Sequence, residues 1–402
     1  MRKPLEGVRV LDLSRVLSGP WATQLLDDLG ADVIKVEKPG AGDDTRHWGP
    51  PWHQHGDERV AAYFLAANRG KKSVAIDFAT DEGAALVRRM AANADVLIEN
   101  FKVGGLKKFG LDADSLRNAY PRLIYASITG FGQDGPYAQR AGYDYIIQGM
   151  GGLMSLTGIP DGEPGGGPIR VGVAVADLFT GMYTASTILA ALYRREQTGE
   201  GATIDMALLD SQLAMLANQA SNALVSGKDP GRQGAGHPNI VPYQPFQAAD
   251  QPIIIAVGND RQFARFAAIV GHPEWAEDDR FETNAARVAA RKELVPRIAE
   301  IIATRPASEW LEQLEAAGIP AGPINSISQA LADPQAVHRK MSIWAGGGAL
   351  GEVPMVGSPM RIDGERADAP LPPPALGEHG DLLREWVDEA ELARLRAAGI
   401  VG

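Results

Sequence analysis

Short β-branched runs alternate with helical patterns along the first third of the chain, and this alternation limits the fold more than any other feature of the sequence. The apolar runs are VRVLDL (8–13), ADVIKVE (31–37), SVAIDF (73–78), DVLIEN (95–100) and LIYASIT (123–129). Apolar residues at helical spacing lie between them, over residues 22–29 and 81–93. Strands that alternate with helices form βα units, and the strands of such units pair in parallel. The pattern therefore predicts an α/β fold with a doubly wound, largely parallel sheet.

The loops that follow these strands are the expected ligand-binding edge, because ligands of doubly wound sheets bind beyond the carboxyl ends of the strands. Residues 14–18, 37–39, 99–101 and 129–132 occupy that edge. No GxGxxG follows the first strand, and no GxxxxGK[ST] is present. The two common phosphate-binding motifs of nucleotide-binding proteins are therefore absent from the sequence.

A polar stretch rich in glycine and proline, SGKDPGRQGAGHPN (226–239), interrupts the chain and indicates a domain boundary. A chain of 402 residues also exceeds the usual size of a single hydrophobic core. A new strand and helix begin with QPIIIAVGNDRQFARFAAIVG, and a proline-rich connector, PMRIDGERADAPLPPPALGEHG, precedes a last amphipathic helix. We expect a large domain over residues 1–225, a small α/β domain over 226–325, and a linker and C-terminal segment over 326–402.

Composition excludes several kinds of chemistry. The chain has no cysteine, which rules out disulfides, thiolate metal sites and a cysteine nucleophile. A net charge of −11 argues against a general nucleic-acid or anionic-membrane surface. His53 and His55 lack further clustered ligands, and no serine stands in a GxSxG motif, so no metal site and no hydrolase nucleophile elbow is expected.

The start of the sequence contains no apolar segment of signal-peptide length, and the chain has no uninterrupted run of about 18 apolar residues. We therefore expect a cytoplasmic protein. Three short basic groups make the N-terminal quarter the expected host of an anionic ligand, although solvated loops and helix ends would give the same pattern. These groups are Lys35 and Lys38; Arg69, Lys71 and Lys72; and Lys102, Lys107 and Lys108.

One acid, Asp177, stands between an apolar run and a long apolar helical pattern in VGVAVADLFTGMYTASTILAALYRR (171–195). Its carboxylate could cap the helix by accepting hydrogen bonds from the first backbone N–H groups. It could also be a catalytic group. The two roles are compatible, because N–H groups at a helix start can stabilise an oxyanion formed beside them.

Seven blocks cover nearly the whole chain in a fixed order. They are PLEGVRVLDLSRVLSGPWATQLLDDLGADVIKVEKPGAGDDTR, ANRGKKSVAIDF, DVLIENF, ASITGFGQDGPYAQRAGYDYIIQGMGGLMSLTG, VADLFTGMYTASTILAALYRREQTGEGATIDMALLDS, GHPNIVPYQPF and GIPAGPINSI. Together they resemble the class III CoA-transferase family, of CaiB/BaiF type, the group of formyl-CoA transferase and carnitine CoA-transferase. The resemblance implies a Rossmann-like large domain and a small domain joined by long linkers, with the terminal segment returning to the large domain. It also implies a homodimer of two interlocked chains.

The family resemblance further implies that the enzyme moves CoA from an acyl-CoA to a free carboxylic acid. The aspartate of the family's ADxxxG block, here Asp177, would be the nucleophile. The intermediates would be an aspartyl anhydride and an aspartyl-CoA thioester, both of which need protection from water. Coenzyme A would enter as part of a substrate, with no tightly bound cofactor and no metal.

The residues implied to bind CoA are spread over six short stretches: Leu17, Ser18, Lys38, Ile76, Asp77, Phe78, Ala79, Asn100, Phe101, Lys102, Lys108, Ala141, Gly142, Tyr143 and Asp144. Lys38 and Lys108 stand where formyl-CoA transferase has arginines, and Ala79 and Ala141 stand where it has lysines. We therefore expect other cations, among them Arg69, Lys71 or Lys72, to take over phosphate contacts. The implied loop that shields the intermediate is Gly234, Ala235, Gly236 and His237.

Two other functions are compatible with parts of the pattern. An α-methylacyl-CoA racemase would share the fold, but Tyr143 stands where its histidine base would be. A non-catalytic CoA-binding protein would need only the basic groups. For the transferase, we expect a small or dicarboxylic acid such as succinate, glutarate or mesaconate, with Arg46, Arg170 and His237 as candidate acceptor-facing residues.

Overall fold

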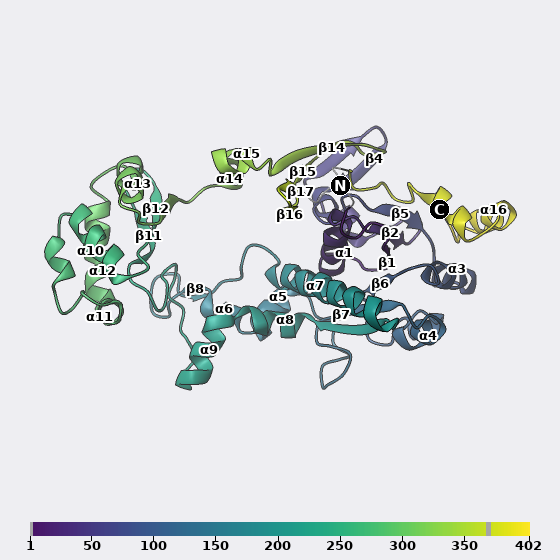
Figure 1. Cartoon of the computed structure of the whole chain (residues 1–402), viewed down its shortest axis with the longest axis horizontal. Helices are drawn as coiled ribbons and strands as arrows, with labels where there is room; N and C mark the ends of the chain where they lie inside the picture. The colour runs from purple at the N-terminus through teal and green to yellow at the C-terminus, as the bar shows by residue number, and fades with distance from the viewer. Residues whose placement is uncertain (1–2, 367–370) are drawn as a thin grey trace. The chain divides into compact units, whose positions relative to one another are not determined.

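The chain divides into two compact units in its computed structural model, which describes residues 3–366 and 371–402 (Figure 1). The first unit contains the chain up to Leu153, Val171–Ser221 and Pro334–Gly402, and the second contains Met154–Arg170 and Asn222–Asp333. Residues 367–370, part of the predicted proline-rich connector, lie outside the described residues. The first unit is therefore assembled from three separate stretches of sequence.

Six parallel strands form the sheet of the first unit, in the order β10-β7-β6-β1-β2-β5. They are β1 (Arg9–Asp12), β2 (Asp32–Glu37), β5 (Lys72–Ala75), β6 (Val96–Glu99), β7 (Ile124–Thr129) and β10 (Ala202–Ala207). Their valine and isoleucine side chains are buried on both faces, as in parallel sheets that are covered by helices on both sides. The prediction of an α/β fold with a parallel sheet is confirmed.

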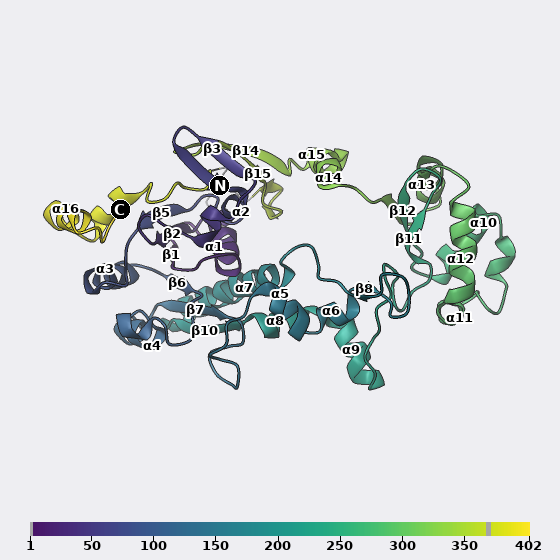
Figure 2. The same ribbon diagram turned by 180° about the vertical axis from the view of Figure 1, so that it is seen from behind.

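One face of the sheet is covered by α1 (Ser18–Asp28) and α7 (Val175–Thr198), which lie side by side in both views (Figures 1 and 2). Val10 of β1 packs there with Leu26 of α1 and Ile188 of α7. Because successive side chains of a strand point to opposite faces, the neighbour of Val10 in the sequence belongs to the core on the other side. The sheet thus has a separate hydrophobic core on each face.

The two helices approach each other closely at Gly181. A β-carbon at this position would lie 2.7 Å from the carbonyl oxygen of Ser18 and 3.1 Å from the ring of Trp21. The lack of a side chain therefore lets α7 lie directly against the start of α1. Since Asp177 is one helical turn before Gly181, this close approach also brings Asp177 beside Ser18.

Within the described part of the chain, α7 is the one helix whose length and mean hydropathy would suit a membrane span. Of its most apolar 18-residue window, 44% is buried inside the fold. Ala185, Ile188 and Leu192 pack in the core on the sheet. Its apolar composition is therefore explained by its place as a core helix.

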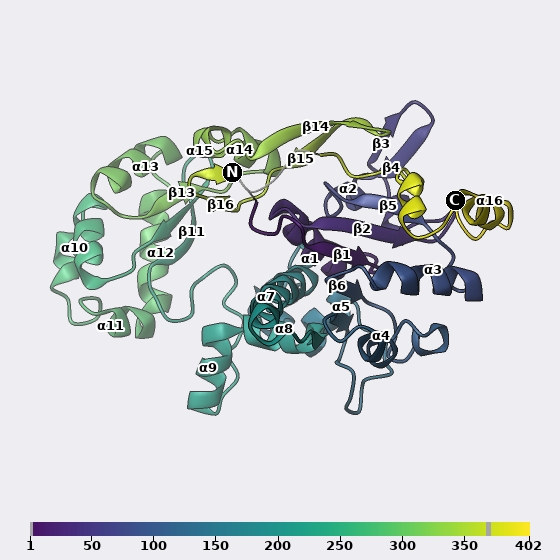
Figure 3. The same cartoon turned by 45° about the vertical axis from the view of Figure 1, so that its right-hand side comes forward.

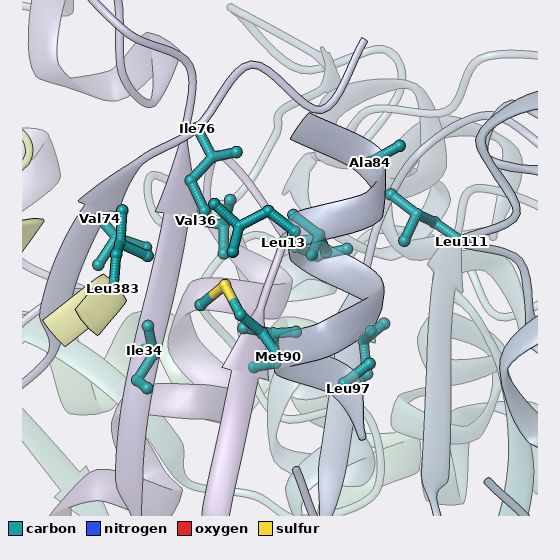
Figure 4. Close-up of a cluster of buried hydrophobic side chains, with 14 of the residues drawn as sticks. Leu13, Ile34, Val36, Val74, Ile76, Ala84, Met90, Leu97, Leu111 and Leu383 are labelled. Carbon is teal, nitrogen blue, oxygen red and sulfur yellow. The ribbon is translucent and has the colours of Figure 1, made fainter. Parts of the chain in front are cut away.

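The opposite face of the sheet is covered by α3 (Asp81–Ala91), α4 (Ala113–Ala119) and α16 (Glu389–Ala397). Figure 4 shows Val36 of the sheet, Met90 of α3 and Leu383 of the C-terminal stretch in this cluster. Residues from both ends of the sequence therefore build one hydrophobic core.

The last residues of the chain pair with the outer edge of β5, the terminal strand of the sheet. The N–H of Asp77 donates to the carbonyl of Ile400 at 2.8 Å, and the N–H of Gly402 donates to the carbonyl of Ala75 at 3.1 Å. Between them, Ile76 and Val401 form an antiparallel bridge. This pairing covers backbone groups through which an exposed strand edge could add another chain.

The second unit has its own sheet and core. Its three antiparallel strands are β11 (Tyr243–Gln247), β12 (Pro252–Ala256) and β13 (Ala321–Pro323). Its main helices are α10 (Asp260–Ile269), α11 (Asn284–Ala289), α12 (Arg291–Ile302) and α13 (Ala307–Ala316) (Figure 3). Phe263, Phe266 and Trp310 are fully buried at its centre.

Shorter elements connect and flank these parts. The helices are η1 (Asp44–His47), α2 (Ala62–Leu65), η2 (Lys107–Phe109), α5 (Asp144–Met150), α6 (Leu153–Leu156), α8 (Leu208–Met215), α9 (Ala217–Ser226), η3 (Pro273–Ala276), α14 (Ile327–Ala332), α15 (Pro334–His338) and η4 (Gly380–Glu385). The strands pair as hairpins: β3 (Trp52–His55) with β4 (Glu58–Ala61), β8 (Gly158–Ile159) with β9 (Gly167–Pro168), β14 (Ser342–Gly348) with β15 (Gly351–Val356), and β16 (Arg361–Ile362) with β17 (Glu365–Arg366).

Candidate active site

A cavity of about 680 Å³ lies within the first unit, beyond the carboxyl ends of the parallel strands. Its walls come from the loops after β1, β6 and β7, from Asp44 and Trp48 after β2, from Leu208 after β10, and from Asp177 of α7. The strand order changes direction between β1 and β6, since β2 lies on one side of β1 and β6 on the other. Crevices at such a switch point are the usual ligand sites of doubly wound sheets.

Asp177 contributes a half-buried carboxylate to this cavity. The hydroxyl of Ser18, the first residue of α1, donates a hydrogen bond to Asp177 Oδ1 at 2.6 Å. Burial raises the pKa of Asp177 from 3.8 to about 6; the Ser18 hydrogen bond opposes this shift, and the nearby charge of Asp144 adds to it. The carboxylate is therefore more basic than an ordinary aspartate but still largely ionised at neutral pH.

Asp177 does not cap its own helix, and this part of the sequence interpretation is wrong. The helix begins at Val175, so Asp177 lies inside its first turn. Asp144 of α5 provides the cap instead, because its Oδ1 accepts hydrogen bonds from the N–H groups of Ala176 at 2.8 Å and Asp177 at 3.4 Å. The Asp177 carboxylate is thus not used for capping and faces the cavity.

Seven of the residues predicted to bind CoA line the cavity: Ser18, Asn100, Phe101, Lys102, Ala141, Gly142 and Tyr143. The others lie outside its lining: Leu17, Lys38, Ile76, Asp77, Phe78, Ala79, Lys108 and Asp144. Ile76 is fully buried next to the C-terminal residues, Lys38 is exposed, and Lys108 lies over the ring of Phe109. The structure therefore brings the stretches after β1, β6 and β7 together around the cavity, whereas the stretch after β5 lies outside its lining and reaches it through Phe78, which packs edge-on against Phe101.

Three basic side chains line the cavity: Arg15, Lys102 and Arg140. Arg15 pairs with Asp44 at 3.0 Å and lies over the ring of Phe101. Arg140 lies over the rings of Phe131 and Tyr137. These cations can attract an anionic ligand to the cavity mouth.

The sequence pattern did not single out Arg15 or Arg140 as binding residues. Arg15 lies within the loop 14–18, which was placed at the ligand-binding edge, and Arg140 directly precedes the selected Ala141. Trp48 was also missed; it lines the cavity and packs edge-on against Tyr63, at 5.3 Å between ring centroids. Burial raises the pKa of Tyr63, and the charges of Asp177 and Asp144 raise it further.

Several basic residues expected to meet the substrate are instead used inside the fold. Arg69 pairs with Asp28, and Lys71 pairs with Asp12 at 3.1 Å, with both pairs buried. This contradicts the expectation that they take over phosphate contacts. Lys72 pairs with Asp32 at 2.6 Å.

Arg46 is likewise engaged inside the first unit, which contradicts its expected position facing the acceptor. It is 6% exposed, and its guanidinium donates to both carboxylate oxygens of Glu37, at 2.6 and 2.8 Å. Arg170 and the predicted shielding loop, Gly234, Ala235, Gly236 and His237, belong to the second unit. In that unit the carbonyl of His237 accepts a hydrogen bond from Arg291 at 2.6 Å.

Among residues 3–366 and 371–402, no three histidine or acidic side chains lie close enough together to hold a metal ion.

Comparison with known proteins identifies the family. The model of CoA-transferase family III matches residues 5–380, so the chain belongs to this family. It is 52% identical to succinate--glutarate CoA-transferase of Agrobacterium fabrum, over 94% of each chain. It is 42% identical to human succinyl-CoA:glutarate CoA-transferase, covering 99% of this chain and 90% of the relative. A crystal structure of a CaiB/BaiF family protein from Brucella suis superposes with a TM-score of 0.85 at 50% identity, over 98% of this chain and 100% of the other.

The protein is therefore an enzyme that transfers CoA from an acyl-CoA to a free carboxylic acid. CoA thioesters are its substrates, and this chemistry needs no tightly bound cofactor. The function predicted from the seven sequence blocks is confirmed.

Two substitutions should move the pKa of Asp177 in opposite directions. Ser18→Ala removes a hydrogen bond to the ionised form, so the pKa should rise above its value of about 6. Asp144→Asn removes a neighbouring negative charge while keeping an oxygen that can accept from Ala176, so the pKa should fall. The measurement is a carboxyl ¹³C NMR titration in which Asp177→Asn identifies the signal. Shifts of both variants in the same direction would contradict this account of the site.

Proposed function

We propose that Asp177 is the nucleophile of the transfer reaction. The observation that carries the proposal is a half-buried carboxylate of raised pKa, which lines a cavity at the switch point of the sheet. Poor solvation makes a carboxylate oxygen more basic, and it need not shed a full hydration shell before attacking a carbonyl carbon. Because its pKa stays near 6, the ionised form still dominates at neutral pH.

Four steps complete one turnover. Asp177 attacks the thioester carbonyl of the donor, which forms an aspartyl anhydride and releases CoA thiolate. The thiolate attacks the aspartyl carbonyl of the anhydride, which forms an aspartyl-CoA thioester and releases the donor acid as its carboxylate. The acceptor carboxylate attacks that thioester, which forms a second anhydride and again releases the thiolate. The thiolate then attacks the acceptor carbonyl of this anhydride and regenerates Asp177.

Asp177→Asn should abolish transfer without harming the fold. An amide cannot form the anhydride, whereas the neutral side chain avoids burying a charge. The folded pKa of about 6 exceeds the unfolded value near 3.8, so the stability linked to Asp177 is lost as pH rises through 6. We therefore expect Asp177→Asn to melt at an equal or higher temperature than the unsubstituted protein at pH 7.5.

The intermediate itself can be trapped. After incubation with an acyl-CoA, hydroxylamine should convert Asp177 to a hydroxamate, detected by mass spectrometry of the peptide that contains it. Asp210→Asn is the matched control, because Asp210 also lies in the first turn of a helix but is exposed. Its activity should be unchanged. A hydroxamate at another residue, or substantial transfer by Asp177→Asn, would refute the nucleophile assignment.

We also propose that Arg15, Lys102 and Arg140 meet the phosphates of CoA. They are the basic residues of the cavity lining, whereas Arg69 and Lys71 are occupied by buried acids. A guanidinium can hold a phosphate through two hydrogen bonds. Direct contacts from Lys38, Lys108 and residues 76–79 stay predictions from the family resemblance.

Arg15→Ala and Arg140→Ala should each raise the KM for the acyl-CoA by about 10-fold and change kcat little, because phosphate contacts are the same in the ground and transition states. Added salt should raise the KM of the unsubstituted enzyme more than that of either variant. Steady-state kinetics at two ionic strengths provide the measurement. An unchanged KM with a collapsed kcat would assign these residues to the chemical steps instead.

The proposed substrates are a succinyl-CoA donor and glutarate as acceptor. This choice is supported by relatives at 52% and 42% identity that carry these substrates in their names. A panel of acyl-CoA donors crossed with free acids, read by mass spectrometry of the CoA products, tests it. We expect glutaryl-CoA from succinyl-CoA and glutarate to be the fastest product. Faster transfer to oxalate or mesaconate would overturn the substrate assignment and leave the transferase assignment intact.

We further propose that the enzyme is an interlocked homodimer, with residues 1–225 and 226–325 as its large and small domains. Exposed apolar side chains on helices in mutual contact support an interface: Phe179, Met182 and Tyr183 of α7, Ile146 and Met150 of α5, and Leu213 of α8. Soluble monomers rarely expose large apolar patches. Shielding of the intermediates by residues 234–237 and a cytoplasmic location stay predictions.

Interlocked chains cannot separate without unfolding. Two preparations with different tags, folded separately and then mixed, should therefore form no mixed dimers until they are denatured and refolded together. Native mass spectrometry of the mixture provides the measurement. Mixed dimers that form within minutes under native conditions would exclude interlocking, and a monomeric protein would exclude the dimer.

A further inference from the structure

The loop between β1 and α1 contains a residue in an unfavourable backbone conformation. Val16 has φ of +73°, in the left-handed region that β-branched residues strongly avoid. Val16 lines the cavity and stands two residues before Ser18, whose hydroxyl donates to Asp177. Such a conformation persists only where the surrounding structure holds it in place.

The buried carboxylate of Asp43 holds Val16 in this conformation. The backbone N–H of Val16 points at this carboxylate, at 3.2 Å from Oδ1 and 3.3 Å from Oδ2. The N–H and hydroxyl of Thr45 also donate to Oδ1, at 3.0 and 2.7 Å. Asp43 is 1% exposed, so its carboxylate depends on these partners in place of water.

Lys35 supplies the opposite charge. Its ammonium lies 3.0 Å from Asp43 Oδ2 and donates to the carbonyl of Ser14 at 2.7 Å, and neither side chain of the pair is exposed to solvent. Burial would raise the pKa of Asp43, but Lys35 and Thr45 hold it below its ordinary value. The ion pair therefore holds the loop at two points, through the carbonyl of Ser14 and the N–H of Val16.

The backbone geometry at Val16 determines how α1 begins. The next residue, Leu17, is the N-cap of α1, makes no side-chain capping bond, and accepts a hydrogen bond at its carbonyl from the N–H of Trp21 at 2.7 Å. Ser18 is the first residue of the helix. A rotation about φ of Val16 would therefore redirect the chain just before the hydroxyl that contacts Asp177.

We propose that Asp43 is a positioning residue for CoA transfer: paired with Lys35, its carboxylate holds Val16 in the left-handed conformation and thereby aims the Ser18 hydroxyl at Asp177. The proposal rests on the proposed role of Asp177 as nucleophile. Asp43 itself does not line the cavity, so it acts on the reaction through Val16 and Ser18.

Asp43→Asn tests whether the carboxylate of Asp43 is needed for fast transfer. The amide keeps one oxygen that can accept from Val16 but no longer balances Lys35, so the loop should relax. We expect kcat to fall by about 10- to 100-fold, the effect of a misplacement of about 1 Å, with the KM for acyl-CoA changed less than about 3-fold. The Ser18 hydrogen bond lowers the pKa of Asp177, so its loss in Asp43→Asn should raise that pKa. The acid limb of the kcat/KM profile should therefore move to higher pH.

Val16→Gly separates positioning from a merely structural role. Glycine adopts positive φ readily, so it keeps the turn without the hold of Asp43. Measured against Val16→Gly as its reference, Asp43→Asn/Val16→Gly should lose much less kcat than Asp43→Asn loses against the unsubstituted enzyme. If Asp43 only stabilises the fold, glycine at position 16 would not restore kcat.

Asp28→Asn is the matched control, because it removes the acid of another buried ion pair, that with Arg69. It should lower the melting temperature while leaving kcat and the pH profile unchanged. If Asp43→Asn does not fold, Lys35→Met/Asp43→Asn removes both charges together, and the same rescue by Val16→Gly is expected. Unchanged kcat in the Asp43 variants, or no rescue by glycine, overturns the proposal.

The hydroxamate experiment distinguishes failure of the positioning role of Asp43 from failure of the nucleophile role of Asp177. If the unsubstituted enzyme is labelled at Asp177 and the Asp43 variants do not follow the expected order, the positioning role fails and the nucleophile stands. If the unsubstituted enzyme is labelled elsewhere, the proposed function fails regardless of how the Asp43 variants behave.

Discussion

The site depends on keeping one carboxylate, that of Asp177, poorly solvated and yet ionised. Burial raises its pKa to about 6, and a single hydroxyl limits the rise. Gly181 lets α7 approach α1 closely enough for this contact, and Asp144 takes over the capping of α7. Desolvation of the charged carboxylate costs stability, a common balance in active sites, whereas the Ser18 hydrogen bond and the Asp144 cap are favourable contacts.

The charged residues near the carboxyl ends of the strands form two groups, one buried inside the fold and one lining the cavity. Asp12 pairs with Lys71 and Asp43 pairs with Lys35, and both ion pairs are buried inside the fold. Arg15 and Arg140 remain at the cavity wall, held over aromatic rings. A basic residue of the N-terminal region can therefore stabilise the fold through a buried ion pair or line the ligand cavity. Its burial in the structure distinguishes the two roles.

Periodicity predicted the sheet well, because β-branched runs buried on both faces leave a strong local signal, as in residues 31–37 and 123–129. Asp177 could be selected because it interrupts two apolar patterns, and the family blocks then indicated its role. The cap from Asp144 could not be predicted, since it joins residues 33 positions apart through the packing of two helices. The acidic partners of Arg46 and Lys71 could not be predicted either, because they depend on how the strands pair. The position of Arg140 at the cavity depends on the conformation of a loop, which the local sequence pattern does not determine.

The discontinuity of the first unit affects the order of events during synthesis. The second unit ends at Asp333, whereas Leu383, Leu392 and Leu395 complete the core on one face of the large sheet. While a ribosome is still making the intervening chain, α3 and α4 can cover that face but the C-terminal leucines cannot, so part of its apolar surface is available to chaperones or to other nascent chains. The part of the protein translated in the middle can therefore finish folding before the part translated first, and the core of the first unit is completed only after its C-terminal stretch has been made.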